Sequence, residues 1–163
     1  MLIRTLLLPA LLTAVTGLAA ATPEWGVQGA LAVPTADLSS SAGLGLQGGA
    51  NAKWNFGGGH GVMGRADLTL YSGKDGANDS SFGVAADYTC HPDRNARGVY
   101  FLGGLSFLTY SAGHGTDSVN GFGLDLGVGY DQDRHIGYQI RYTTHSINSA
   151  TLASLNLGIT YTF

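Results

Sequence analysis

Histidine is the residue type in this chain that most readily does chemistry, because imidazole binds metals and transfers protons near neutral pH. The 163 residues include five histidines, which are His60, His91, His114, His135 and His145. No two of them stand at the short spacing that places two metal ligands side by side. The single cysteine, Cys90, can form no intramolecular disulfide. We therefore expect no metal site and no cofactor.

Charged side chains are the next candidates for a functional role, and they are scarce in this chain. Asp, Glu, Lys and Arg make up 12% of the chain, about half the share of an ordinary soluble domain. Eleven acidic residues against eight basic ones argue against a nucleic-acid partner, because binding phosphates requires clustered Lys and Arg. The charged residues that lie well inside patterned segments are Lys53, Arg65, Asp67, Asp87, Asp125 and Arg141.

Eight segments hold these charges, and in each of them apolar and polar residues alternate, as in β-strands with one apolar face. The sixth segment is typical, with Phe122, Leu124, Leu126, Val128 and Tyr130 on one face. The fifth segment is apolar on both faces, since Tyr100, Leu102 and Leu108 oppose the face to which we assign Val99, Phe101, Leu105 and Phe107.

All six charges fall on the face opposite the apolar one. A Lys or Arg that faced the middle of a lipid bilayer would cost about 2–4 kcal/mol, whereas the lumen of a membrane β-barrel can be polar. Because buried charges must be paired, we predict that Lys53, Arg65 and Arg141 pair with the three aspartates across the lumen. Glycine accounts for 26 residues, and those on the same face leave room for these long side chains.

The chain ends on an aromatic residue in a strictly alternating segment. Leu155, Leu157, Ile159, Tyr161 and Phe163 share one face of it. A soluble protein seldom ends on an apolar stripe of this kind, whereas a strand that closes a barrel in lipid has reason to do so. No stretch after residue 21 has the roughly 20 apolar residues of a spanning helix, so we predict a membrane crossing by strands.

The first 21 residues have the features of a cleaved signal peptide. Arg4 provides the positive charge, residues 6–15 the apolar core, and residues 19–21 the small side chains of a cleavage site. We therefore predict two parts, a signal peptide at residues 1–21 and one barrel domain at residues 22–163.

The connections between the segments fit an orientation of the barrel with the N-terminus in the periplasm. With this orientation the aromatic residues gather near the two membrane interfaces, as in known membrane barrels. The periplasmic turns are then short. The outer loops are rich in Ser, Gly, Asn and Asp and cover Thr35–Gly43, Ser72–Ser81, Ser111–Gly121 and Ser146–Ser154.

A secreted lipocalin-like barrel is the main structural alternative. Its apolar faces would line an internal ligand cavity, and its polar faces would meet water. The polar faces of this chain carry few charges and many glycines for a soluble exterior. We therefore favour an all-β fold, an eight-stranded antiparallel up-and-down transmembrane β-barrel.

The segments 121–131 and 136–142 resemble the sixth and seventh strands of the small bacterial outer-membrane β-barrel proteins of the OmpA/OmpX/OmpW type. The final strand resembles their closing strand. The resemblance implies the outer membrane of a Gram-negative bacterium, with lipid including lipopolysaccharide around the barrel. It also implies an assembly machinery that reads the C-terminal aromatic residues, here Tyr161 and Phe163. Members of this family share a fold rather than one activity.

The stretch His145-Ser146-Ile147-Asn148 resembles the His-x-Ser-Asn stretch of outer-membrane lipid A deacylases, which use a Ser–His–acid site. Two differences argue against the same activity. Neighbouring residues of a strand point to opposite faces, which separates His145 from Ser146, and no Asp or Glu follows Asp133. We therefore expect no catalytic residues.

These patterns predict a monomeric structural protein of the outer membrane. Eight strands enclose a space that side chains fill, which favours a closed lumen over a conducting one. The alternatives are a deacylase-like hydrolase that uses His145 and Ser146, a small conducting barrel, and the lipocalin-like binding barrel.

Overall fold

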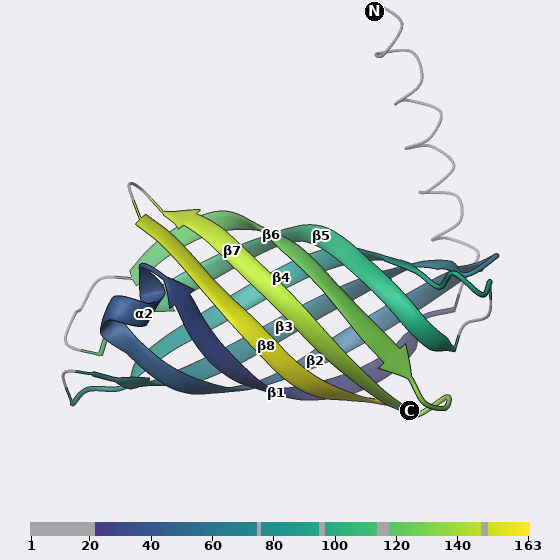
Figure 1. The fold of residues 1–163 in the computed structure, drawn as a ribbon, viewed down its shortest axis with the longest axis horizontal. Helices are drawn as coiled ribbons and strands as arrows, with labels where there is room; N and C mark the ends of the chain where they lie inside the picture. The colour runs from purple at the N-terminus through teal and green to yellow at the C-terminus, as the bar shows by residue number, and fades with distance from the viewer. Residues whose placement is uncertain (1–21, 75, 95–96, 114–117, 148–149) are drawn as a thin grey trace, which may run out of the picture.

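The computed structural model describes residues 22–74, 76–94, 97–113, 118–147 and 150–163. They form a closed antiparallel barrel in which each strand pairs with its sequence neighbours and the first pairs with the last (Figure 1). The strands are β1 (Glu24–Ala36), β2 (Ala42–Gly57), β3 (His60–Gly73), β4 (Asp79–Cys90), β5 (Gly98–Ser111), β6 (Ser118–Asp131), β7 (Ile136–Ile147) and β8 (Ala150–Thr162). The predicted eight-stranded up-and-down barrel is confirmed. The predicted signal peptide, residues 1–21, lies outside the described residues.

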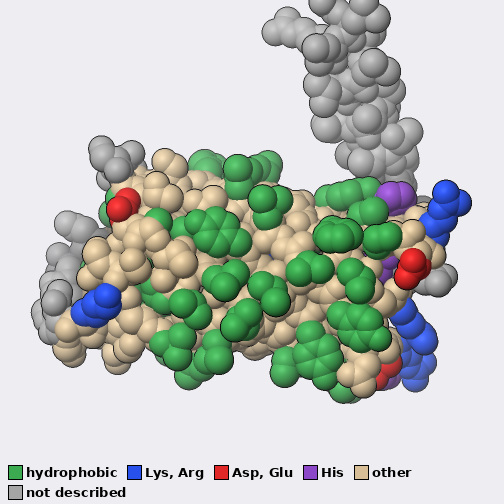
Figure 2. Space-filling view, in the orientation of Figure 1, with side chains coloured by type: hydrophobic (Ala, Val, Ile, Leu, Met, Phe, Trp, Pro, Cys, Tyr) green, Lys and Arg blue, Asp and Glu red, His purple; other side chains and the backbone are tan. Residues whose placement is uncertain are grey.

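The apolar faces of the strands point away from the barrel. Leu105, Phe122 and Leu126 expose 67%, 76% and 66% of their surface, and Figure 2 shows hydrophobic side chains spread over the wall with charged ones at its two ends. The opposite faces line the lumen, where Asp87 and Arg141 are fully buried. The lipocalin-like arrangement, with the apolar faces turned inward, is therefore wrong for this chain. An apolar outer wall around a polar interior is the arrangement that suits hydrocarbon.

Strand β5 follows the phase assigned to it from the sequence. Val99, Phe101 and Leu105 are exposed on the outer wall, whereas Tyr100 and Leu102 are buried in the lumen. The second apolar face of this strand therefore fills part of the interior instead of facing lipid.

The start of β1 and the C-terminus lie at one end of the barrel. The backbone N–H of Phe163 donates to the carbonyl of Trp25 at 2.9 Å, and the C-terminus lies beside the turn between β6 and β7 (Figure 1). We call this end the terminal end, and we call the opposite end, where β1 turns into β2, the loop end.

The connections at the loop end are shorter than predicted. Strands β7 and β8 stay paired as far as Ile147 and Ala150, so most of the loop expected at Ser146–Ser154 is strand. Strands β5 and β6 stay paired as far as Ser111 and Ser118, and the β3–β4 hairpin extends in the same way. The part of a strand that projects past the hydrocarbon core of the membrane needs no apolar face. Its cross-strand hydrogen bonds still satisfy the backbone N–H and C=O groups. The alternation in the sequence therefore ends before the strands do.

A short helix at the loop end was not predicted. It is α2 (Leu38–Ser41), which connects β1 to β2. Four residues are too few to show a helical period in the sequence. No helix in the described ranges is both long and apolar enough to cross a membrane.

The outward phase of the wall can be tested at Leu126, which lies between Gly103 and Tyr142 in the register. We expect Leu126→Arg to impair folding into phospholipid vesicles, because an Arg at the bilayer midplane costs about 2–4 kcal/mol. The shift in gel mobility between unheated and heated samples measures the folded fraction. Asn78→Arg, at an exposed site of the β3–β4 connection, should fold like the wild type. Equal folding of the two variants would contradict the assignment of the wall.

Candidate functional site in the barrel lumen

The lumen is filled in layers, and the inward residues of β3 give their order. From the terminal end to the loop end these residues are Met63, Arg65, Asp67, Thr69 and Tyr71, all of them buried. Met63 belongs to an apolar layer with Tyr100 and Leu102. Arg65 and Asp67 belong to an ionic layer, Thr69 lines a small cavity, and Tyr71 belongs to an apolar plug.

Arg65 is the centre of the ionic layer. Its guanidinium donates to carboxylates on three strands, namely Asp67 of β3, Asp87 of β4 and Asp125 of β6. The distance from Arg65 Nε to Asp87 Oδ2 is 2.8 Å. None of these four side chains is more than 4% exposed. Arg65 thus links neighbouring and opposite parts of the wall through the interior.

Arg141 completes the ionic layer from β7. It is fully buried, its Nη2 donates to Gln47 Oε1 at 2.9 Å, and the same nitrogen lies 3.6 Å from Asp67 Oδ2. Two guanidinium groups and three carboxylates therefore share one buried layer. Such groups stabilise a fold only as a set, because removing one member leaves the others buried without compensation.

Lys53 lies outside the ionic layer, at the mouth of the terminal end. Its Nζ is 3.1 Å from Asp131 Oδ1 and 5.4 Å from the centroid of the Tyr100 ring. His91 Nε2 lies 3.4 Å from the same carboxylate, beside a hollow of about 160 Å³. The expected pairing of Lys53 with a carboxylate of the ionic layer is therefore corrected. Lys53 lies opposite Met63 in the register, one layer nearer the mouth, where Asp131 at the end of β6 is within reach.

Glycines beside the large lumen side chains make this packing possible. Gly104 is the cross-strand neighbour of both Asp87 and Asp125. A Cβ at Gly104 would overlap the Asp87 carboxylate, and a Cβ at Gly129 would overlap the Tyr100 ring. At these two positions the packing therefore requires glycine.

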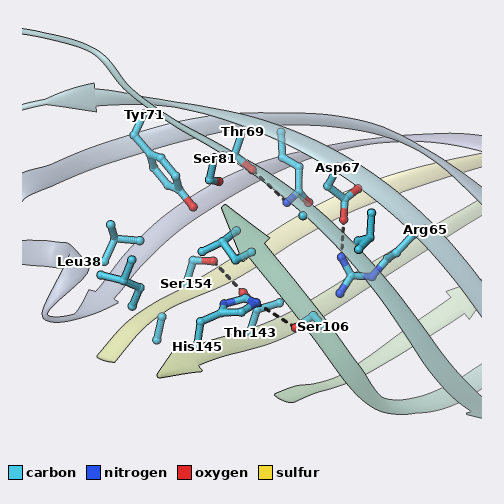
Figure 3. A pocket seen from close by; sticks show the side chains of 16 residues that line it. Leu38, Arg65, Asp67, Thr69, Tyr71, Ser81, Ser106, Thr143, His145 and Ser154 are labelled. Carbon is cyan, nitrogen blue, oxygen red and sulfur yellow. Dashed lines mark hydrogen bonds and ion pairs between the residues drawn. The ribbon is translucent and has the colours of Figure 1, made fainter. Parts of the chain in front are cut away.

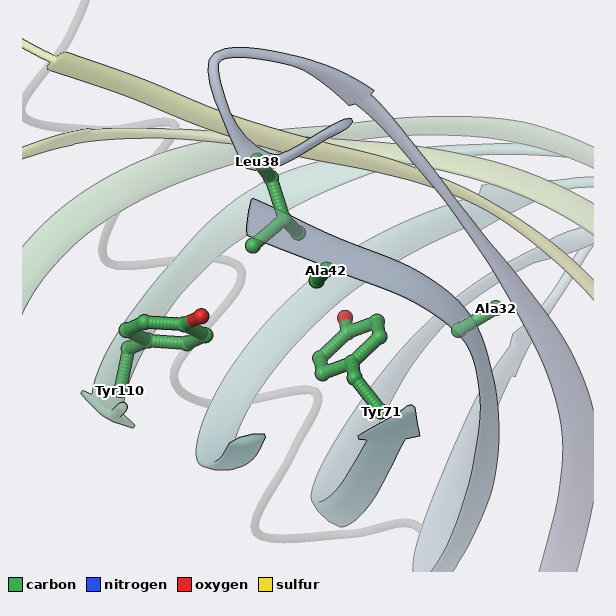
Figure 4. Packing of buried hydrophobic residues seen from close by; sticks show 5 residues of the cluster. All are labelled: Ala32, Leu38, Ala42, Tyr71 and Tyr110. Carbon is green, nitrogen blue, oxygen red and sulfur yellow. The ribbon is translucent and has the colours of Figure 1, made fainter. Parts of the chain in front are cut away.

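An apolar plug closes the loop end of the lumen. Leu38 of α2 points inward and packs with Ala32, Ala42, Tyr71 and Tyr110 (Figure 4). Leu38 is 3% exposed although it belongs to a surface connection. We call these five residues the Leu38 plug.

Hydrogen bonds on two sides hold α2 in this position. The backbone N–H of Thr151 on β8 donates to Asp37 Oδ2 at 2.7 Å, and the Asp37 N–H donates to the Thr151 carbonyl at 3.2 Å. The Lys74 N–H donates to the Ser41 carbonyl at 3.0 Å, and Lys74 Nζ donates to the Ser39 carbonyl. The plug is thus tied to β8 and to the β3–β4 connection.

His145 has a partner that the sequence pattern did not reveal. Its Nε2 lies 2.9 Å from Ser106 Oγ of β5 (Figure 3), whereas Ser146 is exposed. The pair borders a cavity of about 40 Å³ between the ionic layer and the Leu38 plug. Gly123 pairs with Ser106 on one side and with His145 on the other, so one row of the sheet holds all three. A correct register would have identified the pair from the sequence.

A Ser–His contact at this distance is the geometry of a nucleophile and its base. In the described part of the chain, however, no carboxylate hydrogen-bonds to His145, and the exposed fractions of Ser106 and His145 are 6% and 5%. A cavity of about 40 Å³ holds water rather than an acyl chain. The arrangement supports packing of the lumen rather than acyl transfer.

The two terminal aromatic residues lie on the outer wall at the terminal end. Tyr161 stacks on His135 with 5.7 Å between ring centroids and meets Phe163 edge to face at the same distance. The Phe163 side chain is 73% exposed. Across the ranges that the structure describes, no group of three or more His, Cys, Asp or Glu is arranged to hold a metal ion.

Solved structures share this barrel at low sequence identity. Ail, the attachment invasion locus protein of Yersinia pestis, matches with a TM-score of 0.59 and 14% identity, over 86% of this chain and 97% of Ail. Neisserial surface protein A matches with a TM-score of 0.53 and 15% identity, over 86% of this chain and 97% of its own. The N-terminal barrel domain of Pseudomonas aeruginosa OprF matches with a TM-score of 0.56 and 11% identity, over the same shares. These likenesses concern the fold.

A family model gives the assignment that fold similarity alone does not. No curated protein matches this chain significantly. The model of the outer membrane protein beta-barrel domain matches residues 5–163. Together with the apolar wall and the closed eight-stranded sheet, this match shows that the chain belongs to the outer membrane protein beta-barrel domain family and is a protein of the outer membrane.

Proposed function

We propose that this protein is a structural component of the outer membrane, a monomeric closed barrel with neither a catalytic nor a conducting site. The observation that carries the proposal is the filled lumen, in which the Arg65 cluster occupies the middle and the Leu38 plug closes the loop end. Cleavage of the signal peptide after Ala21 and a periplasmic terminal end belong to the same proposal. The role of such a barrel is to fill and support the envelope.

The apolar outer wall indicates that membrane lipid is the partner of this barrel. The connections at the loop end contain one basic residue besides histidine, Lys74, and three aspartates, which are Asp37, Asp75 and Asp117. A ligand that carries several phosphate or sulfate groups needs several cations to bind it. We therefore propose that lipopolysaccharide contacts this barrel through its acyl chains. Ail has been crystallised with the heparin analogue sucrose octasulfate, and the acidic loop end argues against the same ligand here.

A conducting barrel is the alternative that planar-bilayer recordings can test. We expect the pure wild-type protein to give no stable channels, because side chains fill the lumen in several layers. Leu38→Gly should remove the plug and still give no channels, because the ionic layer stays in place. Stable and selective channels from the wild-type protein would contradict the proposal.

The ionic layer should dominate the stability of the lumen. We expect Arg65→Met to lower the free energy of unfolding by about 3–5 kcal/mol, because three carboxylates lose their buried partner. Urea unfolding in lipid vesicles measures this loss. Lys53→Met should cost only about 1 kcal/mol, because its pair at the mouth is closer to water. Adding Asp87→Asn to Arg65→Met should recover part of the loss, and equal losses in the two single variants would count against the layered lumen.

We propose that the assembly machinery recognises Tyr161 and Phe163. Phe163→Ala should lower the amount of protein in the outer membrane of cells but leave folding of the pure protein into vesicles unchanged, because the exposed ring makes few contacts with the rest of the barrel. Phe122→Ala is the matched control, since Phe122 is an equally exposed aromatic residue away from the C-terminus. Similar losses in cells for both variants would show that the C-terminal ring has no special role.

A further inference from the structure

The outer wall has a broad, open hollow in the half of β5–β8 nearest the terminal end. Its volume is about 490 Å³. The residues that shape it are apolar or aromatic and include Val128, Tyr130, Tyr138, Ile140, Leu157 and Ile159. All six side chains are exposed on the outer wall, so hydrocarbon fills the hollow when the barrel is in a membrane. One acyl chain is the occupant that this shape and chemistry fit.

A polar turn begins where the hollow ends. Tyr130 and Tyr138 are cross-strand partners at its edge, and the turn from Gln132 to His135 joins the strands on which they lie, β6 and β7. The Tyr138 hydroxyl donates to Gln132 Oε1 at 3.1 Å. Figure 1 shows this turn beside the C-terminus. A lipid whose chain occupies the hollow would therefore have its headgroup at this turn.

Arg134 lies in this turn with its guanidinium fixed on one side. Arg134 Nε donates to His135 Nε2 at 2.9 Å, and His135 Nδ1 donates to the Thr162 carbonyl at 2.7 Å. The two terminal nitrogens of Arg134 have no hydrogen-bond partner within the described ranges. A guanidinium with two nitrogens available in a fixed plane binds a phosphate group through two hydrogen bonds.

Asp133 provides the opposite charge next to Arg134. Its Oδ1 accepts the backbone N–H of Ile136 at 2.8 Å and that of His135 at 2.7 Å. These two backbone hydrogen bonds lower the pKa of Asp133, so the carboxylate is ionised at neutral pH. The second carboxylate oxygen accepts no hydrogen bond from the described residues. The turn therefore offers one cation and one anion to a headgroup, and Arg97 of the β4–β5 connection lies close enough to act on the Asp133 charge as well.

We propose that the hollow and this turn form a binding site for one glycerophospholipid with a phosphoethanolamine headgroup. One acyl chain lies in the hollow, the phosphate binds Arg134, and the primary ammonium donates to Asp133. A headgroup with only a negative charge would leave Asp133 uncompensated, and a quaternary ammonium has no N–H to donate. The proposal rests on the membrane location of the barrel and does not depend on whether its lumen is closed.

Native mass spectrometry of the pure full-length barrel in detergent tests this site. The protein is titrated with phosphatidylethanolamine, phosphatidylglycerol and phosphatidylcholine that carry identical acyl chains. We expect phosphatidylethanolamine to be retained about threefold better than either of the others, which is the scale of one exposed charge pair. Equal retention of the three lipids, or a preference for either of the others, would overturn the proposal without the use of any variant.

Variants separate the two parts of the site. Arg134→Gln should reduce retention of all three lipids, because each of them carries a phosphate group, and Asp133→Asn, which keeps an acceptor for the turn, should remove the advantage of phosphatidylethanolamine over phosphatidylglycerol. Val128→Phe should fill the hollow and reduce retention of all three lipids without changing their order.

Two control variants carry matched changes outside the site. Arg94→Gln alters an exposed Arg of the β4–β5 connection, and Val84→Phe enlarges an outward residue of β4. Both should retain the wild-type lipid profile, and heated and unheated gel mobility confirms that each variant is folded. The same profile for Arg134→Gln and Arg94→Gln would refute the headgroup contact, and the same profile for Val128→Phe and Val84→Phe would refute the acyl-chain contact.

Discussion

The narrow lumen of an eight-stranded barrel is the constraint on which the rest of this structure depends. Several of the large lumen side chains lie beside a glycine of the neighbouring strand that faces the same space. Gly104 lies between Asp87 and Asp125 in this way, and a Cβ at Gly127 would lie 3.1 Å from the Cα of Arg141. The abundance of glycine therefore has a packing cause. The long polar side chains fill the narrow lumen, and the inward glycines provide the space that they need.

This constraint changes what holds the interior together. In a soluble domain, burial of apolar side chains drives folding, but here most large apolar side chains face outward to lipid. The middle of the interior is instead joined by Arg65, whose three carboxylate partners come from β3, β4 and β6. Thin apolar layers lie on either side, around Met63 toward the terminal end and around Leu38 toward the loop end. These layers separate the ion pairs from bulk water, which makes each pair stronger and each loss more costly.

The fold and the phase of every strand could be predicted from the sequence because lipid and lumen make opposite demands on alternate residues. Even β5, apolar on both faces, was assigned correctly. Arg65 and Arg141 lie against the inward aspartates as predicted. The other partners inside the lumen could not be predicted, because they depend on register. Lys53 binds Asp131 rather than a residue of the ionic layer, and His145 binds Ser106, on the second strand away from it. Helix α2 was missed because four residues carry no period.

The same dependence on register links the Leu38 plug to closure of the barrel. Leu38 packs against residues of β1, β2, β3 and β5, and Asp37 beside it exchanges two hydrogen bonds with Thr151 of β8. These strands converge on α2 only when β1 and β8 are paired along their length. In an open sheet the Leu38 side chain would have no such pocket, and the carboxylates around Arg65 would be open to water from one side. The filling of the lumen is therefore a consequence of closing the sheet, and it makes the closed barrel harder to open than the backbone ladder between β1 and β8 alone would.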